Sequence, residues 1–304
     1  MPNWCVNQLH LDGPDSADII KFMTEPTPLL HHQATRAAVK LFLAGVAAIL
    51  KPTMPLRFES YPDLVQGVGA NTPENQAFTQ FVTLISANPS LTDDVCQRVL
   101  MLFEQSGLKQ RYWGDLPKSA RAKISPLLKN SAYDWSGLYF RRLPLDIVWA
   151  KLDLPESSST PVRFSLNALL PPTLLVEING FNGHLFSRDA GISSGFNDNC
   201  ERLGTKWEQV DVDEWDEDRL EFDTAWSPAL PPIAELARRY PNTAITHYFV
   251  ECGCAFSGYI HYVNGGVDEE HWDDLQFSEE ENEQGYHDLI GPDYVLENFS
   301  HYGG

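Results

Sequence analysis

The residues best suited to chemistry lie in one stretch near the C-terminal end of the chain. Cys252 and Cys254 are two positions apart, so in a strand both side chains would point to the same face. His247 and His261 flank them on what we expect to be neighbouring strands, and Glu251 precedes the first cysteine. This set could support a cysteine nucleophile with a histidine base, or hold a transition metal through thiolates and imidazoles. One hypothesis is therefore a metal-assisted or cysteine-dependent enzyme.

The same residues also fit a purely structural role. The spacing C-x-C differs from the C-x-x-C of a zinc site, and the other three cysteines of the chain are isolated. With nine histidines in 304 residues, a histidine near a cysteine is unsurprising. We therefore interpret Cys252 and Cys254 as small buried thiols and expect no metal and no cofactor. The candidate catalytic residues that remain are His247, Glu251, Cys252 and His261.

The distribution of charge is the strongest signal in the sequence. The 42 acidic and 22 basic residues give a net charge of -20. Residues 1–197 are balanced, with 17 of each sign, whereas residues 198–304 carry 25 acidic and 5 basic side chains. From Asp268 onward there are 12 acidic residues and neither Lys nor Arg. Charge of this sign disfavours direct binding to nucleic acid or to an anionic membrane.

The acidic end allows two interpretations. Runs of like charge are usually solvated, partly flexible tails. Alternatively, the carboxylates form an ordered face that imitates nucleic-acid phosphates, because Trp272, Phe277 and Phe299 lie among them and a solvating tail has no use for large apolar groups. On this second interpretation the binding residues are Asp268, Glu269, Glu270, Asp273, Asp274, Glu279, Glu280, Glu281 and Glu283.

Hydrophobic periodicity predicts the elements that must position these residues. We expect, in order, a strand over residues 4–11, a helix over 15–23, strands over 206–213 and 219–226 joined by an acidic turn, a helix over 227–241, and two strands hinged at Gly253. This order predicts an α+β protein with a split ferredoxin-like βαββαβ sheet.

A long helical stretch interrupts this pattern after the first helix. Residues 31–130 contain amphipathic segments separated by prolines, the clearest of which begins at Thr92 as N-cap. We expect a ferredoxin-like domain over residues 1–27 and 155–304, ending in an acidic extension, and a mainly helical inserted domain over residues 28–154. Residues 155–161 are interpreted as a short linker, and the apolar segment after it as a strand or extended chain broken at Pro171-Pro172.

The apolar runs and the cysteines of the sequence indicate where in the cell the protein is found. The longest apolar run, residues 41–50, is about half of the roughly 20 residues needed to cross a bilayer. The five cysteines are odd in number and scattered, and Met1 is not followed by a basic and then apolar leader. We therefore expect a reduced, cytoplasmic protein that does not contact a membrane.

Three tryptophans on the predicted strands have two possible roles. Trp4, Trp207 and Trp226 could pack in the core with the indole N–H satisfied at the sheet edge, or they could form a stacking platform for single-stranded nucleic acid. A stacking platform needs basic surroundings, which this acidic region does not supply. We therefore favour core packing.

Five short motifs occur in a recognisable order: MPNWCVNQLHLDG, FSLNALLPP, RLGTKWEQVDV, FDTAWSPALPPIAELARRYP and YFVECGCAFSGYIHY. In these motifs the chain resembles the YubB-like ferredoxin-fold family of plasmid and phage accessory proteins, over residues 1–24 and about 162–265. The resemblance implies a ferredoxin-like fold and carriage on a mobile element, and it implies no catalytic residue. The helical stretch and the acidic end depart from the family's pattern.

Charge and resemblance together favour a non-enzymatic accessory protein of a plasmid or phage that binds a host protein through an acidic, DNA-mimicking C-terminal surface. A nucleic-acid-binding factor, for instance one of a defence system, has the basic surface that would accept such carboxylates. Two alternatives stay open. One is the enzyme described above, and the other is a structural or regulatory module that forms homo-oligomers.

Overall fold

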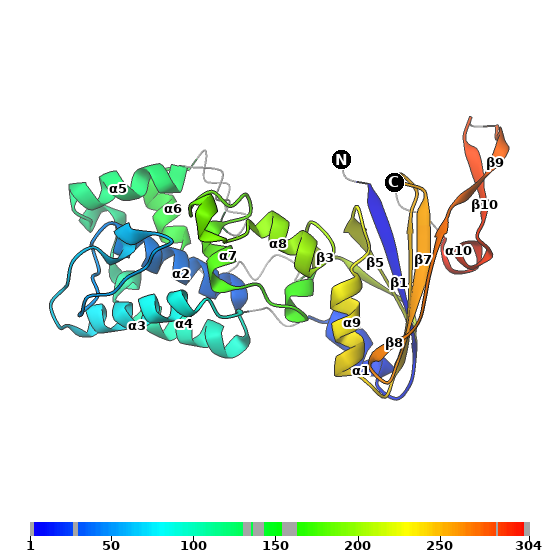
Figure 1. Cartoon of the computed structure of the whole chain (residues 1–304), viewed down its shortest axis with the longest axis horizontal. Helices are drawn as coiled ribbons and strands as arrows, with labels where there is room; N and C mark the ends of the chain where they lie inside the picture. Colours follow the sequence, from blue (N-terminus) through cyan, green and yellow to red (C-terminus); the bar gives the residue numbers. More distant parts are fainter. Residues whose placement is uncertain are drawn as a thin grey trace. The chain divides into compact units, whose positions relative to one another are not determined.

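A computed structural model describes residues 3–26, 30–129, 135, 143–153, 163–283 and 285–300. The chain divides into two compact units (Figure 1). The ferredoxin-like unit comprises Met1–Pro28, Val162–Leu170 and Asn199–Gly304, and the helical unit comprises Leu29–Pro161 and Pro171–Asp198. The chain therefore passes between the units four times.

The ferredoxin-like unit is built on a six-stranded antiparallel sheet with the strand order β4-β5-β1-β6-β7-β8. These strands are β1 (Trp4–Asp12), β4 (Val212–Asp216), β5 (Arg219–Ala225), β6 (Ala244–Glu251), β7 (Phe256–Val263) and β8 (Gly266–Asp274). Helix α1 (Ser16–Thr24) follows β1, and α9 (Leu230–Arg239) follows β5. The predicted α+β class and βαββαβ order are confirmed, with β7 and β8 added beyond β6.

Alternation along each strand decides which face of the sheet a side chain covers. Leu9 and Leu11 on β1 face α1 and α9 and belong to the larger core of this unit. On the opposite face, Val6 and Val250 pack with Val295 of the short helix α10 (Asp293–Asn298). Figure 1 shows α1 and α9 on one side of the sheet and α10 on the other. Both faces of the central strands are thus covered.

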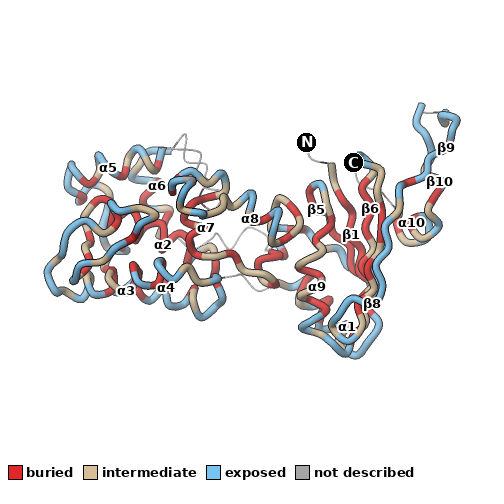
Figure 2. Tube along the Cα trace, in the orientation of Figure 1, coloured by how far each residue is buried: buried red, intermediate tan, exposed pale blue. Residues whose placement is uncertain are grey.

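The acidic end of the chain is regular secondary structure, not the solvated tail that its composition suggests. Strand β8 pairs with β7, and β9 (Gln276–Glu281) pairs with β10 (His287–Gly291) in a separate two-stranded sheet. All residues of β8 are exposed except Asp273, which is half-buried. In Figure 2 the tube of β9 has the exposed colour, whereas that of β1 has mostly the buried colour.

The hairpin before α9 differs from its prediction. Strand β4 runs to Asp216, through most of the expected acidic turn, and only Glu217 and Asp218 separate it from β5. Residues 209–210 form a separate strand, β3 (Gln209–Val210), which pairs with β2 (Phe164–Ser165). Carboxylates on an edge strand stay in water, so an acidic composition does not prevent pairing there.

The helical unit packs around α2 (His31–Val46), fourteen of whose sixteen residues are buried. Among the described residues, further helices are α3 (Pro73–Ala87), α4 (Asp93–Gln105), α5 (Lys118–Lys129), α6 (Leu145–Lys151), α7 (Leu174–Asn179) and α8 (Gly195–Arg202). Short 3-10 helices occur at Pro62–Val65, Leu108–Gln110, Trp113–Asp115, Leu166–Ala168 and Arg188–Ala190. No helix among the described residues is both long and apolar enough to cross a membrane.

The segment after Pro171-Pro172 corrects the expected domain division. It is the helix α7, not extended chain, and residues 171–198 cluster with the helical unit although we had placed them in the ferredoxin-like domain. The physical reason is that Leu174 and Ile178 lie one helical turn apart and both enter the helical core. The predicted linker at 155–161 lies outside the described residues.

Candidate functional site

The two histidines of the hypothetical enzyme centre lie on opposite faces of the sheet. His247 is fully buried, and its Nε2–H donates to Oδ1 of Asn7 at 3.0 Å. Burial lowers the pKa of His247 to about 3, so the imidazole is neutral. His261 pairs with Thr246, the residue before His247, and its Nδ1 lies 2.9 Å from the Thr246 hydroxyl. The sheet therefore separates the two imidazoles.

Glu251 is occupied by the backbone of a tight turn. Its Oε1 accepts from the N–H of Gly253 and its Oε2 from the N–H of Cys254, each at 2.7 Å. A Cβ at position 253 would lie 1.9 Å from Nδ2 of Asn3, so any larger residue there would displace that side chain. The carboxylate is buried and holds the β6–β7 connection in shape. It orients the turn rather than an imidazole.

The two thiols of this turn have pKa values shifted away from reactivity. Burial, followed by the negative charge of Glu251, raises the pKa of Cys252. A hydrogen bond to Glu251, and then its charge, raise the pKa of Cys254, which is exposed and therefore not the buried thiol we expected. Both thiols stay protonated near neutral pH, whereas a nucleophile or metal ligand must be a thiolate. Among the described residues no three His, Cys, Asp or Glu side chains are arranged to hold a metal ion.

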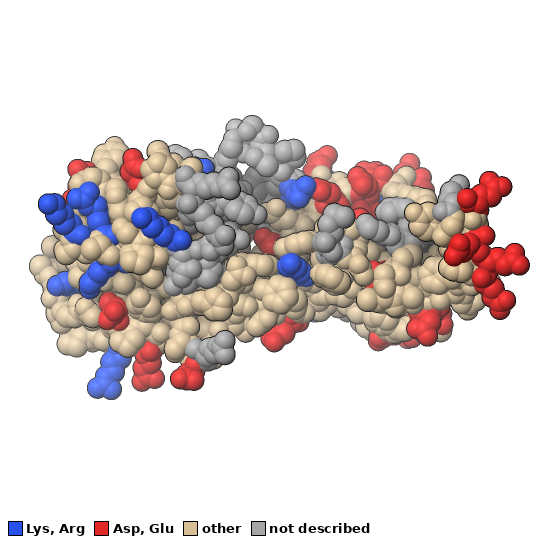
Figure 3. Space-filling model, turned by 90° about the horizontal axis from the view of Figure 1, so that it is seen from above, with Lys and Arg blue, Asp and Glu red and all other residues tan. Residues whose placement is uncertain are grey.

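The acidic residues, in contrast, are brought together on β8. Glu269 and Asp273 pair with His261 and Ser257 of β7, and their side chains lie on the face covered by α10. Glu270 and Asp274 pair with Ile260 and Phe256, and lie on the opposite face. Asp268 sits at the irregularity in the pairing between β7 and β8. On the face shown in Figure 3, red carboxylates gather over the C-terminal part of the ferredoxin-like unit.

Aromatic groups hold three of these carboxylates in place. The indole Nε1–H of Trp272 donates to Oε1 of Glu270 at 2.8 Å, and the hydroxyl of Tyr259 donates to Oε1 of Glu269 at 2.6 Å. The bond to Glu269 raises the pKa of Tyr259 to about 12. Nε2 of His271 lies 2.7 Å from Oδ2 of Asp273. Glu269 and Glu270 are exposed and Asp273 is half-buried, and each carboxylate is oriented by a hydrogen bond to a neighbouring ring.

The hairpin β9–β10 carries the second set of predicted acidic residues. Glu279, Glu280, Glu281 and Glu283 are all exposed. The hairpin has an irregular register, and its connection is held by Asn282, whose Nδ2–H donates to Oδ1 of Asp288 at 2.8 Å. No hydrogen bond ties the four carboxylates to an aromatic ring as on β8, as far as the described contacts show. We therefore treat β8 as the centre of the acidic surface and β9 as its flank.

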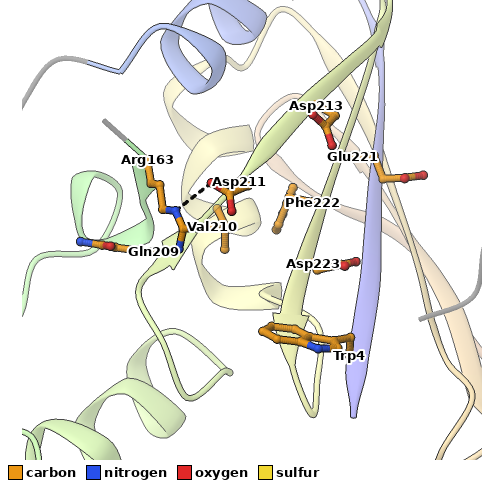
Figure 4. Close-up of a pocket in the computed structure, with 9 residues that line it drawn as sticks. All are labelled: Trp4, Arg163, Gln209, Val210, Asp211, Asp213, Glu221, Phe222 and Asp223. Atoms are coloured by element: carbon orange, nitrogen blue, oxygen red, sulfur yellow. Dashed lines mark ion pairs between the residues drawn. The ribbon is translucent and has the colours of Figure 1, made fainter. Parts of the chain in front are cut away.

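A second acidic feature, which sequence reasoning missed, is a pocket of about 260 Å³ beside the middle of β5 (Figure 4). Four carboxylates line it together with Trp4, Phe222 and Arg163, namely those of Asp211, Asp213, Glu221 and Asp223. Nε of Arg163 lies 2.9 Å from Asp211. The only sequence signal was the alternation of acids along β5. The guanidinium already occupies part of the acidic lining.

The three tryptophans considered for stacking do not lie in the core. The rings of Trp4 and Trp207 are in contact, with centroids 5.7 Å apart, and both side chains are half-buried. Trp226 is 48% exposed and has a left-handed backbone conformation with φ 74°. Our prediction of core packing is therefore wrong for these residues. Trp4 and Trp226 lie at the ends of β1 and β5, Trp207 precedes β3, and none of them belongs to either core of this unit.

Family models and related proteins agree with this architecture. A model described as "Protein of unknown function (DUF1281)" matches residues 27–207, and one described as "Ferredoxin-like domain in Api92-like protein" matches residues 204–289. The second match includes β8 and β9. The acidic strands therefore belong to the ferredoxin-like domain and are not an appendage to it.

Two relatives come from Escherichia coli (strain K12). The uncharacterised protein YubA is 34% identical over 155 residues, which are 50% of this chain and 92% of YubA. The uncharacterised protein YubB is 30% identical over 147 residues, which are 46% of this chain and 99% of YubB. The crystal structure of a protein api92 from Yersinia pseudotuberculosis matches 89% of this chain and 98% of its own, with a TM-score of 0.77 and 25% identity.

These matches confirm the resemblance found in the five sequence motifs. The DUF1281 match alone spans more than half of the chain, from the helical unit into the ferredoxin-like unit. The chain belongs to the DUF1281 family of proteins of unknown function, and its C-terminal part is the ferredoxin-like domain found in Api92-like proteins.

Proposed function

We propose that this protein is a non-enzymatic accessory protein that captures a basic host protein through the acidic surface of β8 and β9. The observation that carries the proposal is the arrangement of Glu269, Glu270 and Asp273, whose carboxylates remain accessible to solvent and are hydrogen-bonded to neighbouring aromatic side chains. Pre-organised charges lose little side-chain entropy when a partner binds. Such a surface favours recognition over mere solubility.

The spacing of the charges resembles that of a nucleic-acid strand. Residues 268–274 carry five carboxylates. At about 3.4 Å per residue they span roughly 20 Å of the edge strand, which gives about one negative charge per 4 Å when the carboxylates of both faces are counted together. One strand of B-DNA carries one charge per about 3.4 Å of helix axis. A protein surface that accepts a phosphate backbone would therefore accept β8 as well.

The partner in this proposal is a nucleic-acid-binding factor of the host, and the setting is a plasmid or phage whose product counteracts a defence system. The charge balance of the C-terminal third, 25 acidic against 5 basic residues, supports a basic partner. It also disfavours direct contact with nucleic acid. The resemblance to mobile-element accessory proteins supports the setting, and the cytoplasm is where such a factor would be met.

An enzymatic function receives less support from the geometry. The sheet separates His247 from His261, Glu251 is bonded to the backbone, and the pKa values of both thiols are raised. We therefore do not assign catalytic roles to these residues.

Charge reversal with a matched control tests the proposal. The triple variant Asp268→Lys, Asp273→Lys, Asp274→Lys should lose the partners that the tagged wild-type protein captures from host extract, because the approaching surface is basic. The control Glu59→Lys, Glu104→Lys, Asp115→Lys makes the same change in net charge on exposed positions of the helical unit and should retain them. Quantitative mass spectrometry of the captured proteins measures both.

Two further readouts decide what was captured. Partners of the acidic surface should elute as salt rises from about 0.05 to 0.5 M, because screening shortens the range of the attraction. Double-stranded DNA should compete for the same partners. If the triple variant captures the same proteins as its control, and salt or DNA has no effect, the acidic surface is not the binding site.

A further inference from the structure

The outer edge of β8 is open. In the described part of the chain, β8 is the last strand of the six-stranded sheet and has no strand on its far side. An unpaired edge presents a row of backbone N–H and C=O groups to any segment that can pair with it. The question is which residues of β8 point these groups outward.

The hydrogen-bond pattern between β7 and β8 shows which residues these are. The N–H of Leu275 donates to the C=O of Ala255 at 2.8 Å, and this pair continues the register in which Asp273 faces Ser257 and His271 faces Tyr259. In an antiparallel pair, hydrogen-bonded and non-hydrogen-bonded positions alternate. The backbone groups of His271 and Asp273 therefore point toward β7. Those of Glu270, Trp272 and Asp274 point to the open edge.

An anchor side chain lies at the centre of this edge. Trp272 is 46% exposed, and its ring packs on Phe249 with centroids 4.5 Å apart. This approach is possible because the intervening Gly258 has no side chain, as a Cβ there would lie 2.5 Å from the Phe249 ring. Glu270 and Asp274 flank the indole on the same face. An arginine beside Trp272 would find both a ring to stack on and two carboxylates.

The negative charge of the β8 edge determines which kind of strand can pair with it. A second copy of this chain is disfavoured, because the opposite edge strand β4 also exposes Asp213, Glu214 and Asp216, and like charges facing each other across a strand pair are destabilising. Charges on edge strands commonly guard against such pairing between copies. The same carboxylates attract a strand of opposite charge, so they do not guard against a basic segment.

We propose that an extended basic segment of the partner protein adds to β8 as a seventh strand, with an arginine against Trp272 between Glu270 and Asp274. This inference rests on the proposed function and names how the partner is held. Backbone hydrogen bonds to the outward groups of Glu270, Trp272 and Asp274 give the affinity, and alternate side chains of the added strand give the specificity.

A pair of variants separates backbone pairing from charge. Glu270→Pro removes an outward N–H and blocks the edge, yet leaves the ladder to β7 intact because that N–H is not used there. Glu270→Ala removes the same carboxylate and keeps the N–H. The probe is a nine-residue peptide of alternating arginine and valine, titrated by calorimetry at about 0.1 M salt. We expect Glu270→Pro to bind at least about fivefold more weakly than Glu270→Ala.

A second probe keeps the test independent of how the proline variant folds. The same peptide, N-methylated at its four central residues, retains every charge but has no central donors on either edge. The wild-type protein should bind it at least about fivefold more weakly than the unmethylated peptide. Trp272→Ala should weaken the unmethylated peptide to a similar extent, since aromatic anchors dominate such interfaces.

The outcomes distinguish this inference from the proposed function. If the methylated and unmethylated peptides bind equally, and the two Glu270 variants are equal, strand addition is overturned while charge-driven capture stands. If neither peptide binds the wild-type protein even at about 0.05 M salt, the acidic surface does not recognise basic segments and both proposals fail.

Discussion

The helical unit buries charged groups in pairs, whereas the ferredoxin-like unit leaves most of its carboxylates in water. Lys40 has no exposed surface, its Nζ lies 2.5 Å from Oδ2 of Asp153, and it also lies 4.5 Å from the centroid of the Trp149 ring. On β8 every acidic residue but the half-buried Asp273 is exposed, and no lysine or arginine is present. The charge of Lys40 is thus matched within the helical unit, where its side chain also packs on Trp149. The carboxylates of β8 remain available to another molecule.

The largest effect expected from this contrast is on the stability of the helical unit. Lys40→Met leaves Asp153 without its counter-ion and should lower the free energy of unfolding by about 3 kcal/mol, as breaking a buried pair does. In the control, Lys109→Met removes the exposed pair with Glu104 and should cost at most about 1 kcal/mol. Urea unfolding measures both. Equal losses would show that the burial of Lys40 has no energetic consequence.

A second prediction concerns the buried imidazole of the ferredoxin-like unit. The pKa of His247 is about 3 in the fold against about 6.5 when unfolded, so the unfolded chain binds a proton that the folded chain does not. The contribution of the neutral His247 side chain to the free energy of unfolding is complete above pH 6.5 and declines as the pH falls toward 3. About 1.4 kcal/mol should be lost by pH 5.5. His247→Gln, which keeps a donor for Asn7, should show a flatter profile in unfolding experiments between these pH values.

The smallest effect is expected on the acidic surface. Neutralising Asp268 and Asp274 to asparagine should change the free energy of unfolding by no more than about 0.5 kcal/mol, with a slight gain from reduced repulsion. Thermal unfolding at low and high salt measures this change. A large loss of stability would mean that these carboxylates hold the fold, and the contrast between the two units would no longer apply.

Sequence periodicity was sufficient for the elements that bury at least one apolar face. The alternation over residues 4–11 and 219–226 predicted β1 and β5, and the spacing of Val99 and Phe103 predicted α4. The strand β8 gave no such signal, because its two faces are both exposed and its composition is that of a solvated tail. It becomes a strand only because β7 offers a free edge, which is a property of the tertiary structure.

The residues of the candidate site also depend on tertiary structure that local sequence patterns do not determine. The predicted hinge at Gly253 is confirmed, whereas Cys252 and Cys254 lie in the turn between β6 and β7 and not on a strand as expected. The relation between His247 and His261 depends on the register of β6 against β7. A shift of one residue moves a side chain to the other face of a sheet. No local pattern determines that register. The strand-addition proposal depends on the backbone groups of Glu270 and Trp272 pointing to the open edge. This could not be predicted from the sequence for the same reason.

The Lys40–Asp153 pair has a consequence for how the polypeptide is made. The two residues are 113 positions apart, so a ribosome exposes the ammonium group well before the carboxylate that will neutralise it. Until Asp153 emerges, complete burial of α2 would place an unmatched cation in an apolar interior, which is strongly unfavourable. The first helices must therefore wait in a looser arrangement during synthesis, and a nascent chain halted before that aspartate would be a ready target for chaperones and proteases.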